Sequence, residues 1–338
     1  MSEAGTPEKP RTVLAMSAST LASLFTPALS TRLNAAAQVE TELASGNPRL
    51  HAHILRGAEV LLTGWGAPRI GARELALMPR LRAIVHAGGT IKTFLDPSVL
   101  ARGIAVSSAA EANAIPVAEF TLAAIILAAK RVTRSAHRYR TTRSGRDLSG
   151  LPPMGTNGIV VGVVGASRVG RRVLELLRVL DVSVLLTDPY LDRETAAALG
   201  AELTGLGDLM HRADIVTLHA PAGPATDGMV SRSLLSRMRD GAVVINTARG
   251  SLVDTGALTA ELVSGRLDAV LDVTDPEPLP ADSPLFGLPN VLLTPHTAGA
   301  LGNEIHRLGE IAVAEVERLA AGLPLVHPVR FEDLERIA

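Results

Sequence analysis

The sequence predicts an α/β chain that folds as two parallel-sheet domains. Its length of 338 residues exceeds what one hydrophobic core usually serves. Short aliphatic runs alternate with helix-like segments along nearly the whole chain, which is the pattern of parallel strands joined by crossover helices. A composition of 47% hydrophobic and 20% charged residues is typical of a globular chain and argues against disorder or a fibrous structure.

The first third of the chain predicts a small doubly wound sheet. We expect its strands at residues 12–16, 60–63, 83–86 and 104–107. Pro116 then stands near the start of a long apolar segment, where the first turn of a helix tolerates proline. We place the domain boundary in this helix, so that one domain comprises residues 1–115 plus 300–338 and the other residues 116–299.

A second series of aliphatic runs predicts a larger sheet. Its six strands are expected at residues 159–164, 182–187, 214–218, 242–246, 269–273 and 291–294. Apolar residues then recur at helical spacing between Ile305 and Leu319. This predicts a final helix followed by an irregular tail.

Charge and composition argue against several function classes. With 33 basic and 34 acidic residues the net charge is -1, so there is no electrostatic reason to expect nucleic acid or an anionic membrane as a partner. The absence of cysteine removes disulfides and thiolate metal sites, and we expect no metal. The N-terminus is polar, and the strongest apolar run, residues 122–129, is too short to span a bilayer. We therefore expect a cytoplasmic protein.

A buried strand runs into a glycine turn at residues 159–170. Gly165 can make the tight turn and Gly170 can bring helix and strand close together, so amides at the helix start could receive a pyrophosphate. Ser167 replaces the middle glycine of the dinucleotide-binding pattern G-x-G-x-x-G. Either the turn shifts slightly or the hydroxyl becomes a further phosphate donor. The cofactor-binding candidates of this turn are Gly165, Ser167, Arg168, Val169 and Gly170.

Asp188 follows the next expected strand, about 18 residues after Gly170. A carboxylate there can accept hydrogen bonds from both ribose hydroxyls of a dinucleotide and repels a 2′-phosphate. This predicts NAD rather than NADP as cofactor. The alternative is that Asp188 only starts a turn with Pro189.

Three polar residues lie at or just beyond the carboxyl ends of late strands, where open α/β sheets bind ligands. They are Arg249, Glu277 and His296. A guanidinium can hold a carboxylate in two hydrogen bonds and polarise an adjacent ketone. An imidazole suits proton transfer near neutral pH, and a neighbouring carboxylate fixes its tautomer and favours its charged form.

The segments around these residues read INTARGSLVD, LDVTDPEPLP and LLTPHTAG. In their order, together with the glycine turn, they closely resemble the D-isomer-specific 2-hydroxyacid dehydrogenase family over almost the whole chain. The resemblance implies a flavodoxin-like substrate domain and a Rossmann NAD-binding domain. It also implies hydride transfer between NADH and a small 2-oxo acid, as in phosphoglycerate dehydrogenases and glyoxylate or hydroxypyruvate reductases. In that reaction Arg249, Glu277 and His296 are catalytic, and Arg249 and His296 contact the substrate.

The same resemblance implies further site residues and a homodimer. Asp272 matches the position that contacts the nicotinamide carboxamide. The other implied cofactor-binding residues are His219, Ala220, Pro221, Thr247 and Ala248, although the interpretation that His219 shapes its loop is the favoured one. The segment 86–90 resembles the substrate loop, whose amides bind the carboxylate. The implied substrate-binding residues of this loop are Ala87, Gly88 and Gly89. Trp65, the only tryptophan, follows an earlier strand and is a further substrate-binding candidate, with a plain packing residue as the alternative.

Two choices stay open at this stage. Residues 130–146 carry six arginines and a lysine, which indicates either a solvated or interface stripe or a site for a dianionic substrate such as a phosphate, phosphonate or dicarboxylate. Some relatives use this fold as dinucleotide-sensing interaction proteins, as transcriptional corepressors do, with little turnover. Glu277 itself favours hydroxy acid chemistry, because formate dehydrogenases carry glutamine beside the histidine.

Overall fold

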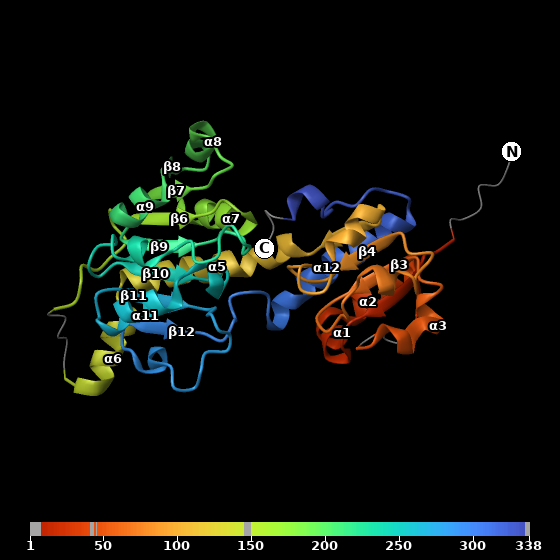
Figure 1. Ribbon diagram of the computed structural model, residues 1–338, viewed down its shortest axis with the longest axis horizontal. Helices are drawn as coiled ribbons and strands as arrows, with labels where there is room; N and C mark the ends of the chain where they lie inside the picture. Colours follow the sequence, from red (N-terminus) through yellow and green to blue (C-terminus); the bar gives the residue numbers. More distant parts are fainter. Residues whose placement is uncertain (1–7, 41–43, 45, 145–149, 335–338) are drawn as a thin grey trace. The chain divides into compact units, whose positions relative to one another are not determined.

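The computed structural model describes residues 8–40, 44, 46–144 and 150–334 (Figure 1). It separates into two compact units. One comprises Met1–Asn113 and Ala300–Ile337, and the other comprises Ala114–Gly299. The chain thus crosses between units two residues before the boundary expected at 115/116 and at the boundary expected at 299/300. Each unit is built on its own parallel sheet.

The first unit has a five-stranded parallel sheet in the order β2-β1-β3-β4-β5. This is the flavodoxin-like order, which confirms the expected fold of this part of the chain. The sequence missed β2, which has only two residues and lies at the edge of the sheet. The strands are β1 (Arg11–Ala15), β2 (Gln38–Val39), β3 (Val60–Thr63), β4 (Ala83–His86) and β5 (Ala105–Ser108).

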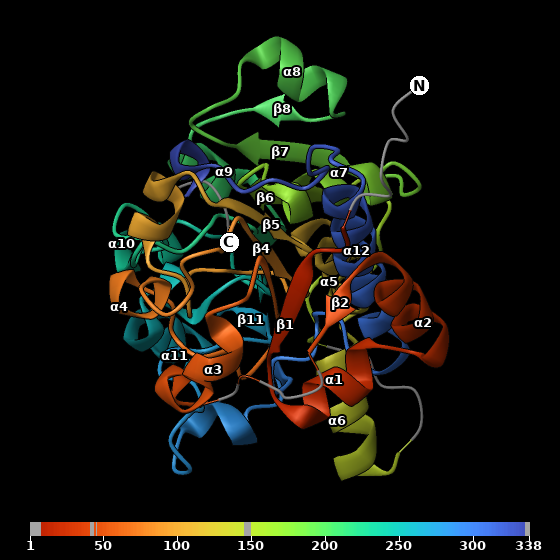
Figure 2. The same ribbon diagram turned by 90° about the vertical axis from the view of Figure 1, so that its right-hand side faces the viewer.

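Helices cover both faces of the first sheet (Figure 2). One buried cluster joins Leu24, Leu29 and Leu308 to one face, and a second joins Ile54 and Leu75 to the other. The helices of the first cluster are α1 (Ala18–Leu24), α2 (Pro27–Ala36) and α12 (Ile305–Ala320). Those of the second are α3 (Ala52–Leu55) and α4 (Ala72–Leu75).

The second unit has a seven-stranded parallel sheet in the order β12-β11-β10-β9-β6-β7-β8. Counted from β6, this is the Rossmann order with one further strand, so the expected fold is again confirmed. The sequence missed β8, another edge strand of two residues. The strands are β6 (Val160–Val164), β7 (Ser183–Thr187), β8 (Glu202–Leu203), β9 (Ile215–Leu218), β10 (Val243–Asn246), β11 (Asp268–Leu271) and β12 (Val291–Leu293).

The helices of the second unit also form two layers. Buried residues of α9 (Leu206–Arg212), α10 (Arg232–Leu235) and α11 (Thr255–Val263) pack on one face of the sheet. Those of α5 (Ala110–Ala129), α7 (Arg168–Leu177) and α8 (Arg193–Ala198) pack on the other. The carboxyl ends of all seven strands therefore open at one edge of the sheet, between two helical layers.

Helix α5 begins earlier than the sequence indicates. We expected Pro116 in its first turn, but the helix starts at Ala110, so Pro116 lies inside it. The expectation was wrong because the preceding alanines extend the helix through a proline that cannot donate a backbone hydrogen bond. At 20 residues α5 is long and apolar enough to cross a membrane. Half of it is buried inside the protein, as in the core helix of a soluble protein.

The Arg-rich segment following α5 forms helix α6 (Val132–Thr142). The buried guanidinium of Arg131 donates to the Gly241 carbonyl at 2.6 Å and to Asp268 at 3.3 Å. Arg134 donates from Nε to the same carboxylate at 2.7 Å. Asp268 is the first residue of β11, so these two arginines anchor α6 at the amino-terminal edge of the sheet. Arg146 lies outside the described residues.

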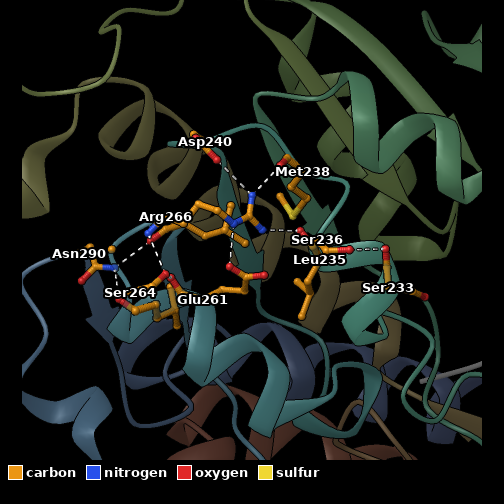
Figure 3. Close-up of polar contacts among 12 residues, drawn as sticks. Ser233, Leu235, Ser236, Met238, Asp240, Glu261, Ser264, Arg266 and Asn290 are labelled. Atoms are coloured by element: carbon orange, nitrogen blue, oxygen red, sulfur yellow. Dashed lines mark hydrogen bonds and ion pairs between the residues drawn. The ribbon is translucent and has the colours of Figure 1, made fainter.

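The side chain of Arg266 links the loop before β11 to the end of α10 (Figure 3). Arg266 donates to the carbonyls of Leu235 and Met238, both at 2.7 Å, and to Glu261 at 2.7 Å. Asn290 donates to two backbone carbonyls of the neighbouring segment, at 2.8 and 2.9 Å. These contacts give additional donors to carbonyls at or near the ends of α10 and α11 and hold the amino-terminal ends of β11 and β12 in place.

The final helix and the tail follow the expectation. Glu315 of α12 is buried, and its carboxylate accepts hydrogen bonds from the amides of Val326 and His327. The tail then crosses to β5, where the Val329 amide donates to the Val106 carbonyl at 2.7 Å. One buried carboxylate therefore fixes the irregular segment against the sheet of the first unit.

Candidate active site and cofactor-binding turn

The glycine turn after β6 is built so that side chains are excluded at two points. Gly165 has a φ of +94°, and a Cβ there would lie 2.7 Å from the Ala220 nitrogen. A Cβ on Gly170 would lie 2.0 Å from the Gly165 carbonyl oxygen. The turn, the first turn of α7 and the segment after β9 therefore pack backbone to backbone, as the glycine spacing predicts.

Ser167 occupies the N-cap position of α7. Its Oγ accepts a hydrogen bond from the Gly170 amide at 3.3 Å, and its φ of -61° is ordinary for any residue. The serine is therefore accommodated without strain. Because Oγ accepts within the helix, its proton remains available to a ligand oxygen. Arg168 and Val169 are the first two helical residues, the former exposed and the latter packed against the sheet.

Asp188, just after β7, contacts the glycine turn directly. Its Oδ2 accepts from the Ala166 amide at 2.7 Å, and its Oδ1 accepts from the Tyr190 amide at 2.9 Å. The second bond is the contact expected if Asp188 starts a turn, and the first places the carboxylate beside the glycine turn. The carboxylate is therefore held at the carboxyl edge of the sheet, and contact with a ribose stays a prediction.

The segment of His219, Ala220 and Pro221, which follows β9, packs against the glycine turn, because the backbone of His219 and Ala220 lies next to Gly165. The His219 side chain is 3% exposed, and burial lowers its pKa to about 3. Nε2 lies 2.9 Å from the Thr217 hydroxyl, whereas Nδ1 has no hydrogen-bond partner among the described residues. The ring is thus neutral and shielded, and any ligand of the turn meets the backbone here. This position fits the loop-shaping interpretation of His219.

Arg249 lies in the loop after β10. Asn246 shapes this loop, because its side chain donates to the Arg249 carbonyl at 2.8 Å and accepts from the Ala248 amide at 3.0 Å. The buried hydroxyl of Thr247 forms a hydrogen bond of 3.0 Å with the hydroxyl of Thr121. Burial lowers the pKa of Arg249 and the charge of Glu277 counteracts this, so the guanidinium is partly desolvated yet still cationic.

Glu277 and His296 form a hydrogen-bonded pair. Glu277 Oε1 lies 2.7 Å from His296 Nδ1, with the two side chains 42% and 48% exposed. Arg249, Glu277 and His296 follow β10, β11 and β12, which are neighbours in the sheet. The structure thus brings the three candidate catalytic residues to one edge of one sheet. The charge of Glu277 acts on Arg249, and the imidazole of His296 remains about half exposed.

Asp272 holds the segment that carries His296. The sequence placed it in a strand, but β11 ends at Leu271. Asp272 is 2% exposed, and its carboxylate accepts from the amides of Thr297 at 2.7 Å and Ala298 at 2.9 Å. Its carbonyl accepts from the His296 amide at 2.9 Å. Since His296 has a φ of +56°, these bonds stabilise a backbone conformation that is unfavourable for histidine.

In the first unit the segment after β4 offers unused amides. Among the described residues, the amides of Gly88, Gly89 and Thr90 donate to no protein group. Three successive free amides are a typical anion-binding feature. Ala87 donates to the Thr63 carbonyl at 2.8 Å and anchors the loop. Trp65, 44% exposed, follows β3, whose neighbour is β4.

Asn113 is a candidate that the sequence analysis missed. Its Oδ1 accepts from the Ala300 amide at 3.0 Å, and a Cβ on Gly89 would lie 3.0 Å from its Nδ2. It therefore lies beside the free amides. No local pattern distinguishes this asparagine from others at a helix start, so only the fold could find it.

The residues present fit a dinucleotide. The glycines at 165 and 170 let the turn, the start of α7 and the segment after β9 pack backbone to backbone, as the dinucleotide-binding pattern requires, and a carboxylate stands at the end of the next strand. Across the described ranges there is no group of three or more His, Asp or Glu side chains placed to hold a metal ion.

Comparisons with known proteins agree with this geometry. The family of D-isomer specific 2-hydroxyacid dehydrogenases, through its NAD binding domain, matches residues 122–298. D-3-phosphoglycerate dehydrogenase of Mycobacterium tuberculosis is 35% identical over 256 residues, which is 75% of this chain and 48% of that protein. Glyoxylate reductase of Aeropyrum pernix is 32% identical over 260 residues, 75% of this chain and 78% of that protein.

Solved structures support the same conclusion. A Thermus thermophilus protein superposes with a TM-score of 0.77 at 29% identity, covering 94% of this chain and 99% of that one. The chain spans about half the length of the phosphoglycerate dehydrogenases that it matches. The family match covers more than half of the chain, and the glyoxylate reductase match covers most of both proteins. The chain therefore belongs to the D-isomer-specific 2-hydroxyacid dehydrogenase family.

Proposed function

We propose that the chain catalyses NADH-dependent reduction of small 2-oxo acids to D-2-hydroxy acids, and the reverse oxidation. The observation that carries this proposal is the Glu277–His296 hydrogen bond of 2.7 Å beside a partly desolvated Arg249. A 2-oxo acid needs a cation for its carboxylate and a proton for its ketone oxygen during reduction. These three residues provide both at one sheet edge.

Arg249 orients and activates the substrate. Its planar guanidinium can hold a carboxylate in two hydrogen bonds while a further N–H points at the ketone oxygen. Partial burial strengthens these contacts, because less water competes for the charge. The Asn246 side chain fixes the loop that presents Arg249.

His296 moves the proton. Glu277 engages Nδ1, so Nε2 is the nitrogen left to face substrate. In reduction the imidazolium donates from Nε2 to the ketone oxygen, and in oxidation the neutral ring accepts the hydroxyl proton there. NADH, when bound, supplies the hydride that reduces the carbonyl carbon. Asp272 keeps His296 in place through its bonds to the following amides.

The cofactor site is proposed at the glycine turn, with Gly165, Ser167 and Gly170 shaping the contact with the pyrophosphate. Asp188 would accept from the ribose hydroxyls and disfavour NADPH through like-charge repulsion. The family comparison supports an NAD cofactor. Arg168, Val169, Thr247 and Ala248 remain proposed neighbours of the cofactor.

The free amides of Gly88, Gly89 and Thr90 are proposed to bind the substrate carboxylate, with Trp65 as a further substrate contact.

A cytoplasmic homodimer is the state we propose for the protein. A dianionic acid is a second candidate substrate class, which the name of the mycobacterial relative supports. The exposed Arg140 and Arg143 lie at the end of α6, which is anchored at the amino-terminal edge of its own sheet, so they would contact such an acid only in the partner subunit's site of the proposed dimer. Arg131 and Arg134 do not contribute to it, because both are engaged by Asp268.

The test is NADH consumption with glyoxylate, pyruvate, hydroxypyruvate, phosphohydroxypyruvate and phosphonopyruvate. We expect turnover that falls by at least about a hundredfold in His296→Asn, the range of general acid–base catalysis. NADH affinity should stay unchanged in that variant. NADH binding without turnover of any acid would favour the dinucleotide-sensing alternative. Replacing Arg140 and Arg143 by glutamine separates the substrate classes, because only dianionic acids should then show a raised KM.

A further inference from the structure

A buried histidine lies directly beneath the free amides of the first unit. His86 is the last residue of β4 and is 5% exposed. Ile84 stands two residues earlier in the same strand, so the side chains of His86 and Ile84 lie on the same face of the sheet, next to the buried cluster that contains Ile84. Its ring lies 4.7 Å from that of Phe94, centroid to centroid. Nothing in the proposed mechanism uses this imidazole.

The ring is fixed by the neighbouring strand. Thr63 is paired with His86 in the parallel register of β3 and β4. Its buried hydroxyl lies 2.9 Å from His86 Nδ1. Burial lowers the pKa of His86 to about 4, with the Thr90 backbone opposing the shift, so the ring is neutral at physiological pH. A neutral ring acts here through its shape and its hydrogen bonds rather than through charge.

The loop is shaped around this ring. A Cβ on Gly88 would lie 2.4 Å from His86 Nε2, about 1 Å short of an ordinary van der Waals contact. Gly88 has no positive φ, so the ring is what excludes a side chain there. The Ala109 amide donates to the carbonyls of both His86 and Gly88 at 3.0 Å, which holds the loop down on the ring.

We propose that His86 is a positioning residue whose buried ring sets the conformation in which the amides of Gly88, Gly89 and Thr90 stay free for the substrate carboxylate. The inference rests on the proposed function of this loop. Thr63 is its partner, because its hydroxyl fixes the ring. The requirement for glycine at position 88 is then a consequence of the histidine at position 86.

The test is a double-mutant cycle of His86→Ala and Gly88→Ala. Gly88→Ala alone must displace the loop by about 1 Å, and displacements of that size can cost about a hundredfold in kcat/KM. Without the ring the added methyl group has space, so the double variant should be no worse than His86→Ala. The loss should lie in KM, with kcat changed less, because a carboxylate is bound in ground state and transition state alike.

Two further variants separate positioning from general stability. Thr63→Val removes the hydroxyl that contacts Nδ1 and should raise KM several-fold. Thr12→Val is the matched control, since Thr12 is a buried threonine of the same sheet whose hydroxyl, among the residues that the structure describes, donates to the Pro10 carbonyl alone. It should leave KM at the wild-type value. NADH affinity should be the same in all variants.

Binding of oxamate, an unreactive analogue of a 2-oxo acid, to the enzyme–NADH complex makes the test independent of turnover. If oxamate binds with the expected variant pattern while no acid is turned over, the proposed reaction is wrong and the role of His86 stands. Losses that multiply in the double variant would overturn the inference. So would a raised KM in Thr12→Val equal to that in Thr63→Val, or the absence of any oxamate binding by the wild-type protein.

Discussion

The two buried histidines predict a steep loss of stability in mild acid. His86 and His219 lie in different units, and burial lowers the pKa of the first to about 4 and of the second to about 3. Unfolding exposes both rings to water, where a histidine has its ordinary pKa of about 6.5. Between these values the unfolded chain binds more protons than the folded one. The free energy of unfolding therefore falls as pH drops below about 6.5.

The magnitude follows from these pKa values. One pKa unit corresponds to about 1.4 kcal/mol. At pH 5 the unfolded rings are about 1.5 pH units below their pKa and are mostly protonated, whereas the folded rings are still almost fully neutral. Each histidine should thus remove about 2 kcal/mol between pH 8 and pH 5. That is a large part of a stability that is commonly about 5–15 kcal/mol.

Urea unfolding at pH 8 and pH 5 measures this loss in the wild type, His86→Gln and His219→Gln. Each variant should be less stable than the wild type at pH 8 but should lose about 2 kcal/mol less on acidification. If the units unfold in separate transitions, each variant should change the pH dependence of its own unit. Val13→Ala, a buried truncation in the same cluster that His86 faces, is the control for lowered stability alone.

The control should lose as much stability on acidification as the wild type. The reasoning is refuted if neither histidine variant reduces the acid loss, because the rings would then be protonated in the folded protein or solvated within it. A reduction equal to that in Val13→Ala would also refute it, since the effect would then come from weaker packing.

Three further predictions concern single contacts. Arg266→Met should lower the free energy of unfolding by about 2–3 kcal/mol, measured in urea, because the Leu235 and Met238 carbonyls and the Glu261 carboxylate each lose a charged donor; an unchanged value would mean that water replaces the guanidinium. Asp188→Asn should narrow the preference for NADH over NADPH by about tenfold in Kd, which is about 1.4 kcal/mol of lost repulsion; an unchanged ratio would remove Asp188 from cofactor selection. Asp272→Asn should lower kcat more than it changes the Kd of NADH, because the amides that hold His296 lose a charged acceptor; a loss confined to NADH affinity would instead indicate a cofactor contact.

The fold was predictable because its long strands are continuous aliphatic runs buried on both faces. Such runs place β3, β4 and β10 within a residue of their observed ends. The edge strands β2 and β8 could not be found, since two residues carry no periodicity. The start of α5 was misplaced because the prediction used the statistical preference of proline for the first turn of a helix. In this helix Pro116 lies in the interior instead.

The candidate site was predictable where a residue type matches a chemical task. Arg249, Glu277 and His296 carry recognisable chemistry, and the sheet order brings them together. The supporting contacts were not predictable, because Asn246 and Asn113 act through hydrogen bonds to backbone that only the folded chain brings near. The Arg-rich segment shows the same limit, since its ion pairs depend on a partner more than 130 residues away.

The central claim is stereospecific reduction of a 2-oxo acid that depends on His296. Its most direct test is chiral analysis of the glycerate formed from hydroxypyruvate and NADH, by the wild type and by His296→Asn. We predict the D enantiomer from the wild type and at least about a hundredfold slower formation by the variant. The L enantiomer, a racemic product, or equal rates in both proteins would contradict the account.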